Sequence, residues 1–280
     1  MLLGSMNTAS ILQYKFFYQF IKLSKRNFNL TGLSFKIIPD NLKGKSKSSQ
    51  EWLTRQLNDV YVKKSRYESY RARSAYKLIE IDDKYKLFKP GMIVIDCGAA
   101  PGSWSQVAIK RVTGKNNENH TEGKVIALDI IHVAPIDGVT ILQEADFKNP
   151  STQKKVIDIL DGSNADIVLS DMAPRASGIK ELDVTNIISL AYTVLQFSIR
   201  ILSIGGTILC KVWDGDSVND LEMNMKKFFS SVKRIKPPAS RMDSAELFLL
   251  GKDFKGIKKL IVGLARPSPQ WESQMVRDGA

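Results

Sequence analysis

One stretch decides the fold: MIVIDCGAAPGSWSQVAIK, residues 92–110. It begins with an apolar strand pattern over 92–96, continues through a turn that contains Gly98 and Gly102, and ends in a helical pattern. A strand, a glycine-bearing turn and a helix bring the backbone close to a nucleotide-like ligand, because a Cβ in the turn would block that approach. The two glycines are four residues apart, so the turn differs from the GxGxxG pattern of dinucleotide enzymes.

Three further strand patterns follow, and each ends in an acid. They cover 124–129, 139–146 and 165–171, and they end in Asp129, Asp146 and Asp171. Each acid alone is more typical of a turn or a helix cap. Together with the helical patterns between and after them, of which 183–202 is the clearest, they indicate a parallel sheet whose carboxyl edge binds a ligand.

Two ionisable residues interrupt apolar strands near the C-terminus. Lys211 lies within 207–213, and Glu246 lies within 245–250. A lysine in such a strand either extends its ammonium to the strand end or serves as a poised base.

Basic residues concentrate in the N-terminal third of the 280-residue chain, whose net charge is +12. The first 39 residues contain no Asp or Glu, which predicts a mitochondrial targeting segment over 1–40. A basic tail that binds RNA is the alternative. The lysine- and serine-containing residues 41–60 are predicted to be a basic linker. The apolar run 16–21 is too short to span a membrane.

Basic and aromatic residues alternate over 61–77. In one helix, Arg66, Tyr70, Arg73 and Lys77 would share a face. Such a face attracts phosphate and stacks on unpaired bases, so we expect RNA binding by Lys63, Lys64, Arg66, Tyr70 and Arg73. A solvated helix whose tyrosines pack on the body is the alternative, and the segment alone does not separate the two.

Metal sites and disulfides are not expected. Cys97 and Cys210 are too few for a disulfide framework, and His120 and His132 are interpreted as structural because no metal-ligand spacing occurs.

Five ordered blocks together resemble the FtsJ/RrmJ family of S-adenosylmethionine-dependent ribosomal RNA 2′-O-ribose methyltransferases, in particular its mitochondrial large-subunit branch. The blocks are 73–78, 96–106, 170–174, 211–212 and 244–246. The resemblance covers about 63–251 and implies a Rossmann-like class I α/β fold, with a mostly parallel seven-stranded sheet and helices on both faces. The methyltransferase domain is accordingly placed at 61–251, with a C-terminal extension over 252–280.

The resemblance also implies the site. The family's Lys-Asp-Lys-Glu tetrad falls on Lys77, Asp171, Lys211 and Glu246. Lys211 would take the ribose proton or stabilise the alkoxide, Asp171 would hold Lys211, and the other two would orient the groups. S-adenosylmethionine would bind at Gly98, Pro101, Gly102, Ser103, Trp104, Asp129, Asp146 and Asp171. Ser103 replaces a family glycine and would strain the turn if its φ were positive. Residues 114–123 are interpreted as an inserted surface loop.

By the same resemblance, the substrate would be a uridine in mitochondrial large-subunit rRNA or a pre-ribosomal particle, methylated by a monomer in the matrix. Two alternatives remain: a 2′-O-methyltransferase acting on a cap or tRNA, and an RNA-binding ribosome assembly factor with vestigial activity. The missing GxGxxG disfavours a nicotinamide dehydrogenase.

Overall fold

The computed structural model describes residues 39, 42–114, 123–174 and 177–257. The predicted targeting segment, His120, most of the inserted loop and residues 258–280 therefore lie outside the described residues, apart from Pro39. The chain divides into two compact units, 1–58 and 59–280.

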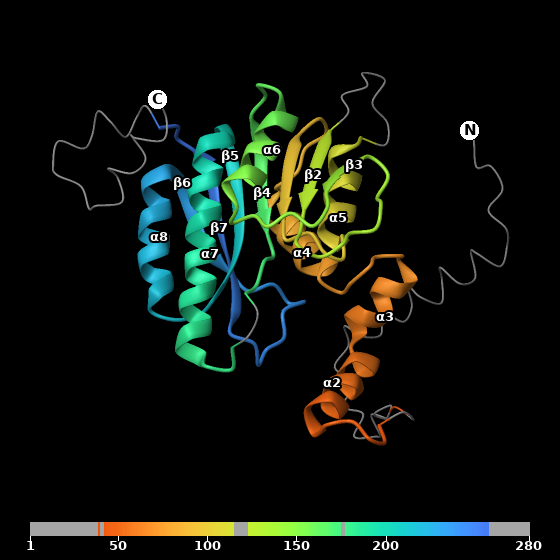
Figure 1. Cartoon of the computed structure of the whole chain (residues 1–280). Coiled ribbons are helices and arrows are strands. Elements are labelled where there is room, and N and C mark those ends of the chain that lie inside the picture. Colours follow the sequence, from red (N-terminus) through yellow and green to blue (C-terminus); the bar gives the residue numbers. More distant parts are fainter. Residues whose placement is uncertain (1–38, 40–41, 115–122, 175–176, 258–280) are drawn as a thin grey trace, which may run out of the picture. The chain divides into compact units, whose positions relative to one another are not determined.

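The second unit is built on one seven-stranded sheet with the order β3-β2-β1-β4-β5-β7-β6 (Figure 1). All neighbouring strands from β3 to β5 pair in parallel, and β7 alone is reversed, pairing antiparallel with β5 and β6. The predicted mostly parallel sheet is thereby confirmed. The strands are β1 (Ile93–Cys97), β2 (Lys124–Leu128), β3 (Val139–Leu142), β4 (Ala165–Ser170), β5 (Leu202–Trp213), β6 (Phe229–Ile235) and β7 (Glu246–Phe254).

Helices cover both faces of this sheet, as expected (Figure 1). Apolar side chains of α4 (Ala75–Tyr85) and α5 (Ser103–Val112) pack on one face. Those of α6 (Pro150–Leu160), α7 (Lys180–Ile201) and α8 (Ser217–Phe228) pack on the other. The central strands are buried on both faces because each face is covered by helices, which explains their continuous apolar runs.

Helix α7 corresponds to the helical pattern at 183–202. By length and composition its segment Glu181–Ile201 could cross a membrane, but more than half of it is buried inside the protein. Its apolar side chains join the core cluster beneath the sheet, so its hydrophobicity is that of a core helix.

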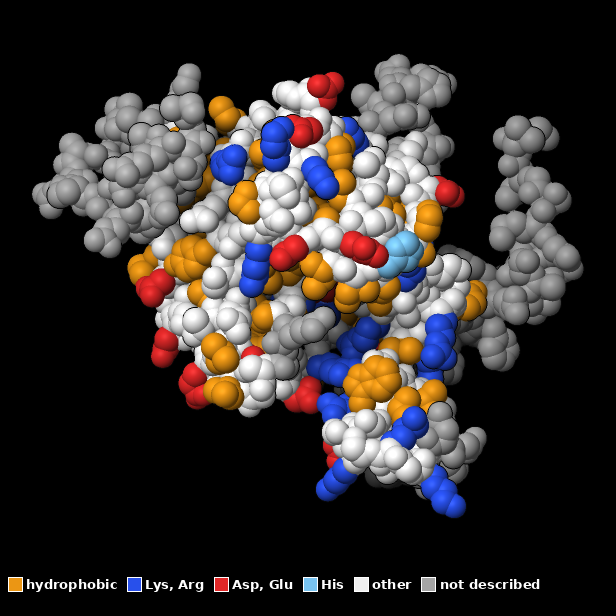
Figure 2. Space-filling view, in the orientation of Figure 1, with side chains coloured by type: hydrophobic (Ala, Val, Ile, Leu, Met, Phe, Trp, Pro, Cys, Tyr) orange, Lys and Arg blue, Asp and Glu red, His pale blue; other side chains and the backbone are white. Residues whose placement is uncertain are grey.

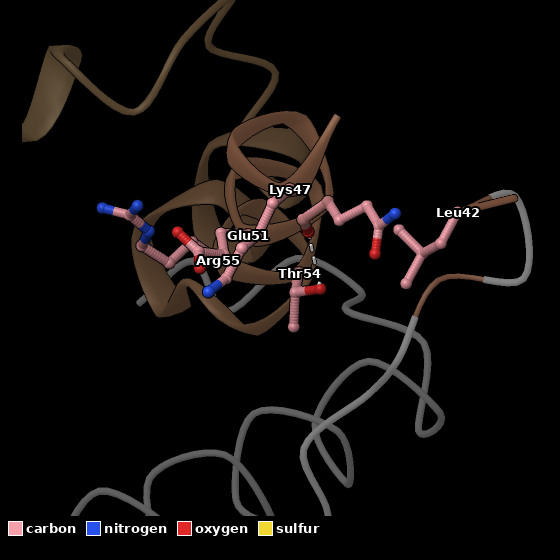
Figure 3. A pocket seen from close by; sticks show the side chains of 6 residues that line it. Leu42, Lys47, Glu51, Thr54 and Arg55 are labelled. Carbon is pink, nitrogen blue, oxygen red and sulfur yellow. Dashed lines mark hydrogen bonds between the residues drawn. The ribbon is translucent and has the colours of Figure 1, made fainter. Parts of the chain in front are cut away.

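The predicted linker 41–60 is not without structure, because it contains α2 (Lys47–Asn58). Its serines lie at the start of this helix, where the backbone N–H of Ser49 donates to Ser46 Oγ at 3.3 Å. Figure 3 shows a hollow beside this helix, lined by Leu42, Lys47, Gln50, Glu51, Thr54 and Arg55. Lys47, Glu51 and Arg55 are exposed and the other three residues are half-buried. Thr54 Oγ1 donates to the Gln50 carbonyl at 2.8 Å within the helix.

The single helical face expected over 66–77 is also wrong. Helix α3 (Val60–Tyr67) ends before Ser69, whose φ is +59°, and α4 begins only at Ala75. The stretch between them turns to contact the body, so Arg66 and Lys77 lie on different helices. At the other end of the domain, β7 runs to Phe254, three residues beyond the predicted boundary at 251.

Candidate active site

The carboxyl edge of the parallel strands gathers the predicted catalytic residues. Asp171 directly follows β4, and Lys211 lies near the end of the adjacent strand β5. Because β7 runs in the opposite direction, its first residue, Glu246, reaches the same edge. Lys77 comes from the first turn of α4 on one face of the sheet. Four separate elements therefore bring the tetrad together.

Lys211 is held by Asp171 through two contacts. Its Nζ donates a hydrogen bond to the backbone carbonyl of Asp171 and lies 3.1 Å from Oδ1 of the same residue. The lysine side chain is only 10% exposed. A cation so nearly buried needs such partners, and they fix the position of its nitrogen at the strand end.

Lys77 and Glu246 form the second pair. Lys77 Nζ lies 2.6 Å from Glu246 Oε2, and Ser240 Oγ donates to Oε1 at 2.8 Å. Burial opposes ionisation of Glu246, but Lys77, Ser240 and Lys211 outweigh it and hold its pKa below the usual value. The carboxylate is therefore the form present at neutral pH.

The two pairs lie beside each other. Lys211 is the cross-strand partner of Phe248, which is two residues from Glu246 on the same face of β7. Next to them is a hollow of about 290 Å³, lined by Ala72, Arg73, Ser74, Lys77, Arg241, Ser244 and Glu246. It offers positive charge and hydroxyl groups around one carboxylate, which suits a sugar-phosphate ligand.

The turn after β1 packs so closely against neighbouring side chains that two of its positions require glycine. Gly98 has φ +78°, and a Cβ there would lie 2.3 Å from Met172 Cγ. Gly102 has φ +107°, and a Cβ there would lie 2.7 Å from both Arg71 Nη1 and Ile136 Cδ1. Between them, Pro101 follows a cis peptide bond. Both glycines are thus required by conformation and by space.

Acids border this turn at two further strand ends. Asp129 accepts hydrogen bonds from the N–H groups of Ala100 and Ile131, each at 2.8 Å, so it fastens the turn after β1 to the end of β2. Ala145 N–H in turn donates to the Asp129 carbonyl at 2.7 Å, which keeps the exposed Asp146 next to this edge. A half-buried carboxylate at the end of β2 still has acceptor capacity for hydroxyl groups.

The two residues after Gly102 point inward. Ser103 is not among the residues with positive φ; it begins α5, and its buried Oγ lies 2.7 Å from Ser74 Oγ. The serine therefore introduces no backbone strain. The Trp104 indole is 2% exposed, donates to the Ser74 carbonyl at 2.9 Å and packs near Phe248. Its side chain belongs to the core and does not line the turn's open side.

Asp96, at the base of this turn, was not assigned to the site from sequence. It is fully buried, Ser105 Oγ donates to its Oδ2 at 2.6 Å, and its Oδ1 has no hydrogen-bond partner among the described residues. Burial raises its pKa to about 7, and the nearby Asp171 and Asp129 contribute, whereas the Ser105 hydrogen bond opposes the shift. This unpaired oxygen can accept a hydrogen bond from a ligand bound at the turn.

The residues expected to bind RNA divide into two groups. Lys63, Lys64 and Arg66 are exposed on α3, and Figure 2 shows Lys and Arg side chains gathered over this helix, whereas both signs of charge are mixed over α6. Tyr70 and Arg73 are used inside the protein: Tyr70 packs edge-on against Tyr76.

Arg73 pairs with Asp59 and donates to the Ala239 carbonyl. Its guanidinium is therefore committed internally, although the residue borders the hollow. Two of the tyrosines follow the packing alternative: Tyr61 donates to Glu80 at 2.7 Å, and Tyr76 donates to Glu68 at 3.0 Å. Tyr67, in contrast, is exposed.

Two arginines of the site were missed. Arg241 borders the hollow from the loop before β7, and Arg71 contacts the glycine turn. Arg71 lies within the basic-aromatic stretch 61–77, but nothing there separates it from its basic neighbours, and Arg241 stands in no pattern at all. Both are placed at the site by contacts between distant parts of the chain.

The cysteines and histidines are not part of the site among the described residues. Cys97 and Cys210 are buried free thiols, and burial raises the pKa of Cys210 to about 12. His132 is exposed. No group of three His, Cys, Asp or Glu residues suited to a metal occurs within the described ranges.

Comparison with known proteins gives consistent matches. A family model described as FtsJ-like methyltransferase matches residues 70–254. The mitochondrial rRNA methyltransferase 2 of Drosophila melanogaster is 48% identical over 219 residues, which is 78% of this chain and 88% of that protein. Ribosomal RNA large subunit methyltransferase E of Parvibaculum lavamentivorans is 44% identical, covering 80% of this chain and 88% of that protein. A solved Plasmodium falciparum structure, assigned to the ribosomal RNA methyltransferases, is 33% identical with a TM-score of 0.59, covering 67% of this chain and 100% of that one.

Proposed function

This chain belongs to the FtsJ-like methyltransferase family, and from that premise we propose that it transfers a methyl group from S-adenosylmethionine to a uridine 2′-hydroxyl in mitochondrial large-subunit rRNA. It is an RNA methyltransferase by family and by its relatives. The observation that carries the finer proposal is the convergence of the Lys211–Asp171 and Lys77–Glu246 pairs beside the glycine turn.

The residues around that turn fit the methyl donor. Gly98 and Gly102 allow the turn its positive φ values and its tight packing against Met172 and Arg71. Asp129 supplies acceptors for ribose hydroxyls, and the unpaired Oδ1 of Asp96 can accept from a donor such as an α-amino group. Asp146 is the candidate for the adenine, and Asp171 for the region nearest the methyl group. When bound, S-adenosylmethionine supplies an electrophilic methyl group on a sulfonium centre.

The tetrad has the groups that a weak ribose nucleophile needs. Lys211 takes the 2′-hydroxyl proton or stabilises the forming alkoxide as the oxygen attacks the methyl group, and Asp171 holds the lysine side chain in place. Lys77, fixed by Glu246, donates a hydrogen bond that orients the ribose. Since the buried pairs are already in place, little rearrangement of the protein is needed for in-line attack.

The hollow next to Lys77 supports a nucleotide substrate. Arg241 and Ser244 lie on its border, and the exposed α3 cations provide a further surface for phosphate. The names of the relatives, which specify rRNA and in one case mitochondria, support the choice of RNA and compartment. The basic, acid-free N-terminal sequence agrees with import.

The test is methyl transfer from isotope-labelled S-adenosylmethionine to three RNAs: mitochondrial large-subunit rRNA, capped RNA and tRNA. Digestion to nucleosides followed by mass spectrometry should detect labelled 2′-O-methyluridine from the rRNA alone. Label on a base, or transfer to capped RNA or tRNA in preference to rRNA, would refute the proposed substrate.

A separate experiment addresses the assembly-factor alternative. In a strain lacking the protein, Lys211→Met should restore neither the 2′-O-methyl mark nor ribosome assembly, if assembly depends on the modification. Restored assembly without the mark would show that a binding role is separable from catalysis. Restoration of the mark by this variant would contradict the role of Lys211.

A further inference from the structure

The irregular segment Ser69–Ser74 joins the RNA-facing helix α3 to α4, which carries Lys77. Both of its ends are hydrogen-bonded to the start of α5. Gln106 accepts from the backbone N–H of Arg71 at 2.9 Å and donates to the Ser69 carbonyl at 3.1 Å. At the other end, the Ser74 carbonyl accepts from the Trp104 indole at 2.9 Å. The segment is thereby fixed to the helix that follows the glycine turn.

Arg71 makes the longest connection from this segment. Its Nη1 donates to the carbonyls of Pro101 at 3.0 Å and Ala134 at 2.7 Å, and its Nη2 donates to the Pro135 carbonyl at 2.7 Å. Pro101 belongs to the glycine turn after β1, and 134–135 belong to the loop after β2. One guanidinium therefore spans the two loops that border the proposed cofactor site.

The fit of this side chain is close. A Cβ on Gly102 would lie only 2.7 Å from Arg71 Nη1, so the guanidinium packs directly against the turn. The planar fork of arginine reaches three carbonyls at once, which the single ammonium of lysine does not reproduce. Since all three acceptors belong to the protein's own backbone, these donors are engaged internally rather than by RNA, unlike the exposed Arg66 on α3.

We propose that Arg71 is a positioning residue that couples the two substrates: it ties the segment leading to Lys77 to the loops that hold the methyl donor, so that binding of the donor strengthens RNA binding. A ligand that orders the turn and the 134–135 loop also orders the carbonyls that Arg71 grips. The segment leading to Lys77 is then held in its binding geometry before RNA arrives, which lowers the ordering cost of RNA binding. By linkage, RNA strengthens donor binding by the same factor.

This inference rests on the proposed function, and its test separates the two. Dissociation constants of a large-subunit rRNA fragment are measured without and with saturating S-adenosylhomocysteine, a non-reactive probe for the donor site. The wild-type protein should bind RNA at least about fivefold more tightly with the probe. Arg71→Met should reduce this ratio to about one, with a weaker affinity for the probe and a lower kcat at saturating substrates.

Two further variants control the result. Arg71→Lys keeps the charge but loses the fork, and it should also lose most of the coupling if the three carbonyl contacts carry it. Lys110→Met removes a cation of α5 that lies 4.3 Å from the ring of Tyr70, which belongs to the same segment as Arg71. This lysine is not one of the donors to the Pro101, Ala134 and Pro135 carbonyls. It should keep the wild-type ratio. Circular dichroism and thermal melting confirm that each variant is folded.

A wild-type ratio of one, or an Arg71→Met protein that binds both ligands more weakly with an unchanged ratio, would overturn the coupling role. The latter result would show a merely structural residue. If the wild type couples the ligands but does not methylate the rRNA, the proposed function fails instead.

Discussion

At the scale of single residues, the two ion pairs of the site have different surroundings. Lys211 is held by two atoms of one residue, Asp171, whereas Glu246 holds Lys77 and also accepts from Ser240. Removing the charge of Glu246 therefore leaves a half-buried lysine without its carboxylate, which is more costly than losing a surface pair.

We predict that Glu246→Gln, which preserves shape, lowers kcat by about 10- to 100-fold, because Lys77 loses its fixed position. The matched control is Glu222→Gln, since Glu222 of α8 also pairs with two cations, Lys226 of α8 and Arg234 of β6, outside the site. Steady-state methyl transfer should show a loss in the first variant only. Equal rates for Glu246→Gln and wild type would remove this carboxylate from the mechanism.

Asp96 gives a prediction about pH and stability. Its pKa is raised from 3.8 to about 7, so between these values the folded protein retains a proton that the unfolded chain has released. The free energy of unfolding therefore falls as the pH rises through this window, by something on the order of 4 kcal/mol for this group alone. Above pH 7 no further loss arises from Asp96.

The measurement is chemical denaturation of wild type and Asp96→Asn, without ligand, from pH 4 to 8. The stability of the wild type relative to the variant should decline between pH 4 and 7 and then stay level. Asp158→Asn, at an exposed pair with Lys154, is the control and should show little change. Parallel curves for wild type and Asp96→Asn would contradict the raised pKa.

At the scale of elements, the glycine turn allows a matched comparison. Gly98 and Gly162 have nearly equal φ values, +78° and +76°, but a Cβ at 162 meets nothing within 4 Å, whereas one at 98 meets Met172. Alanine at either position bears the left-handed strain of about 1–2 kcal/mol. Only Gly98→Ala also displaces Met172, the residue after Asp171.

We therefore expect Gly98→Ala to weaken S-adenosylhomocysteine binding at least about tenfold, and Gly162→Ala to leave it unchanged. Isothermal titration calorimetry gives both constants. If the two variants bind the ligand alike, the turn does not hold the donor as described.

Some elements could be predicted from the sequence and others could not. The strand-turn-helix at 92–110 and the strand ends at Asp129 and Asp171 were predictable because continuous apolar runs and glycine spacing are local signals. The break between α3 and α4 was not, because the basic-aromatic pattern continues through it. Contacts from Gln106, Trp104 and Ser103 determine that break, and these lie about thirty residues away in the chain.

At the scale of the whole molecule, the excess of basic residues predicted a polyanionic partner. The structure shows which of these basic side chains are exposed and can contact such a partner, and which are engaged inside the protein. Tetrad positions could be assigned from ordered sequence blocks, but their pairing depends on the reversed direction of β7, which sequence spacing does not reveal. Likewise, the internal use of Arg73 depends on Asp59 and on the Ala239 carbonyl, and the latter lies 166 residues away.

The exposed cations of α3 should make the affinity for rRNA depend on salt concentration. Lys63→Gln with Arg66→Gln should weaken rRNA binding and reduce the slope of log affinity against log salt by about 0.7 for each phosphate that is no longer neutralised. The control pair Lys154→Gln and Lys155→Gln changes the same charge on α6 and should leave both quantities unchanged. Fluorescence anisotropy across a salt series measures them; equal slopes for the two double variants would exclude α3 from the RNA surface.

The central claim, that Lys211 promotes methyl transfer to a ribose hydroxyl, is tested most directly by a single-turnover rate with saturating rRNA fragment and S-adenosylmethionine. For Lys211→Met we predict a rate at least about 100-fold below wild type, with unchanged binding of S-adenosylhomocysteine. A variant that forms 2′-O-methyluridine at a rate close to that of the wild type would contradict the mechanism.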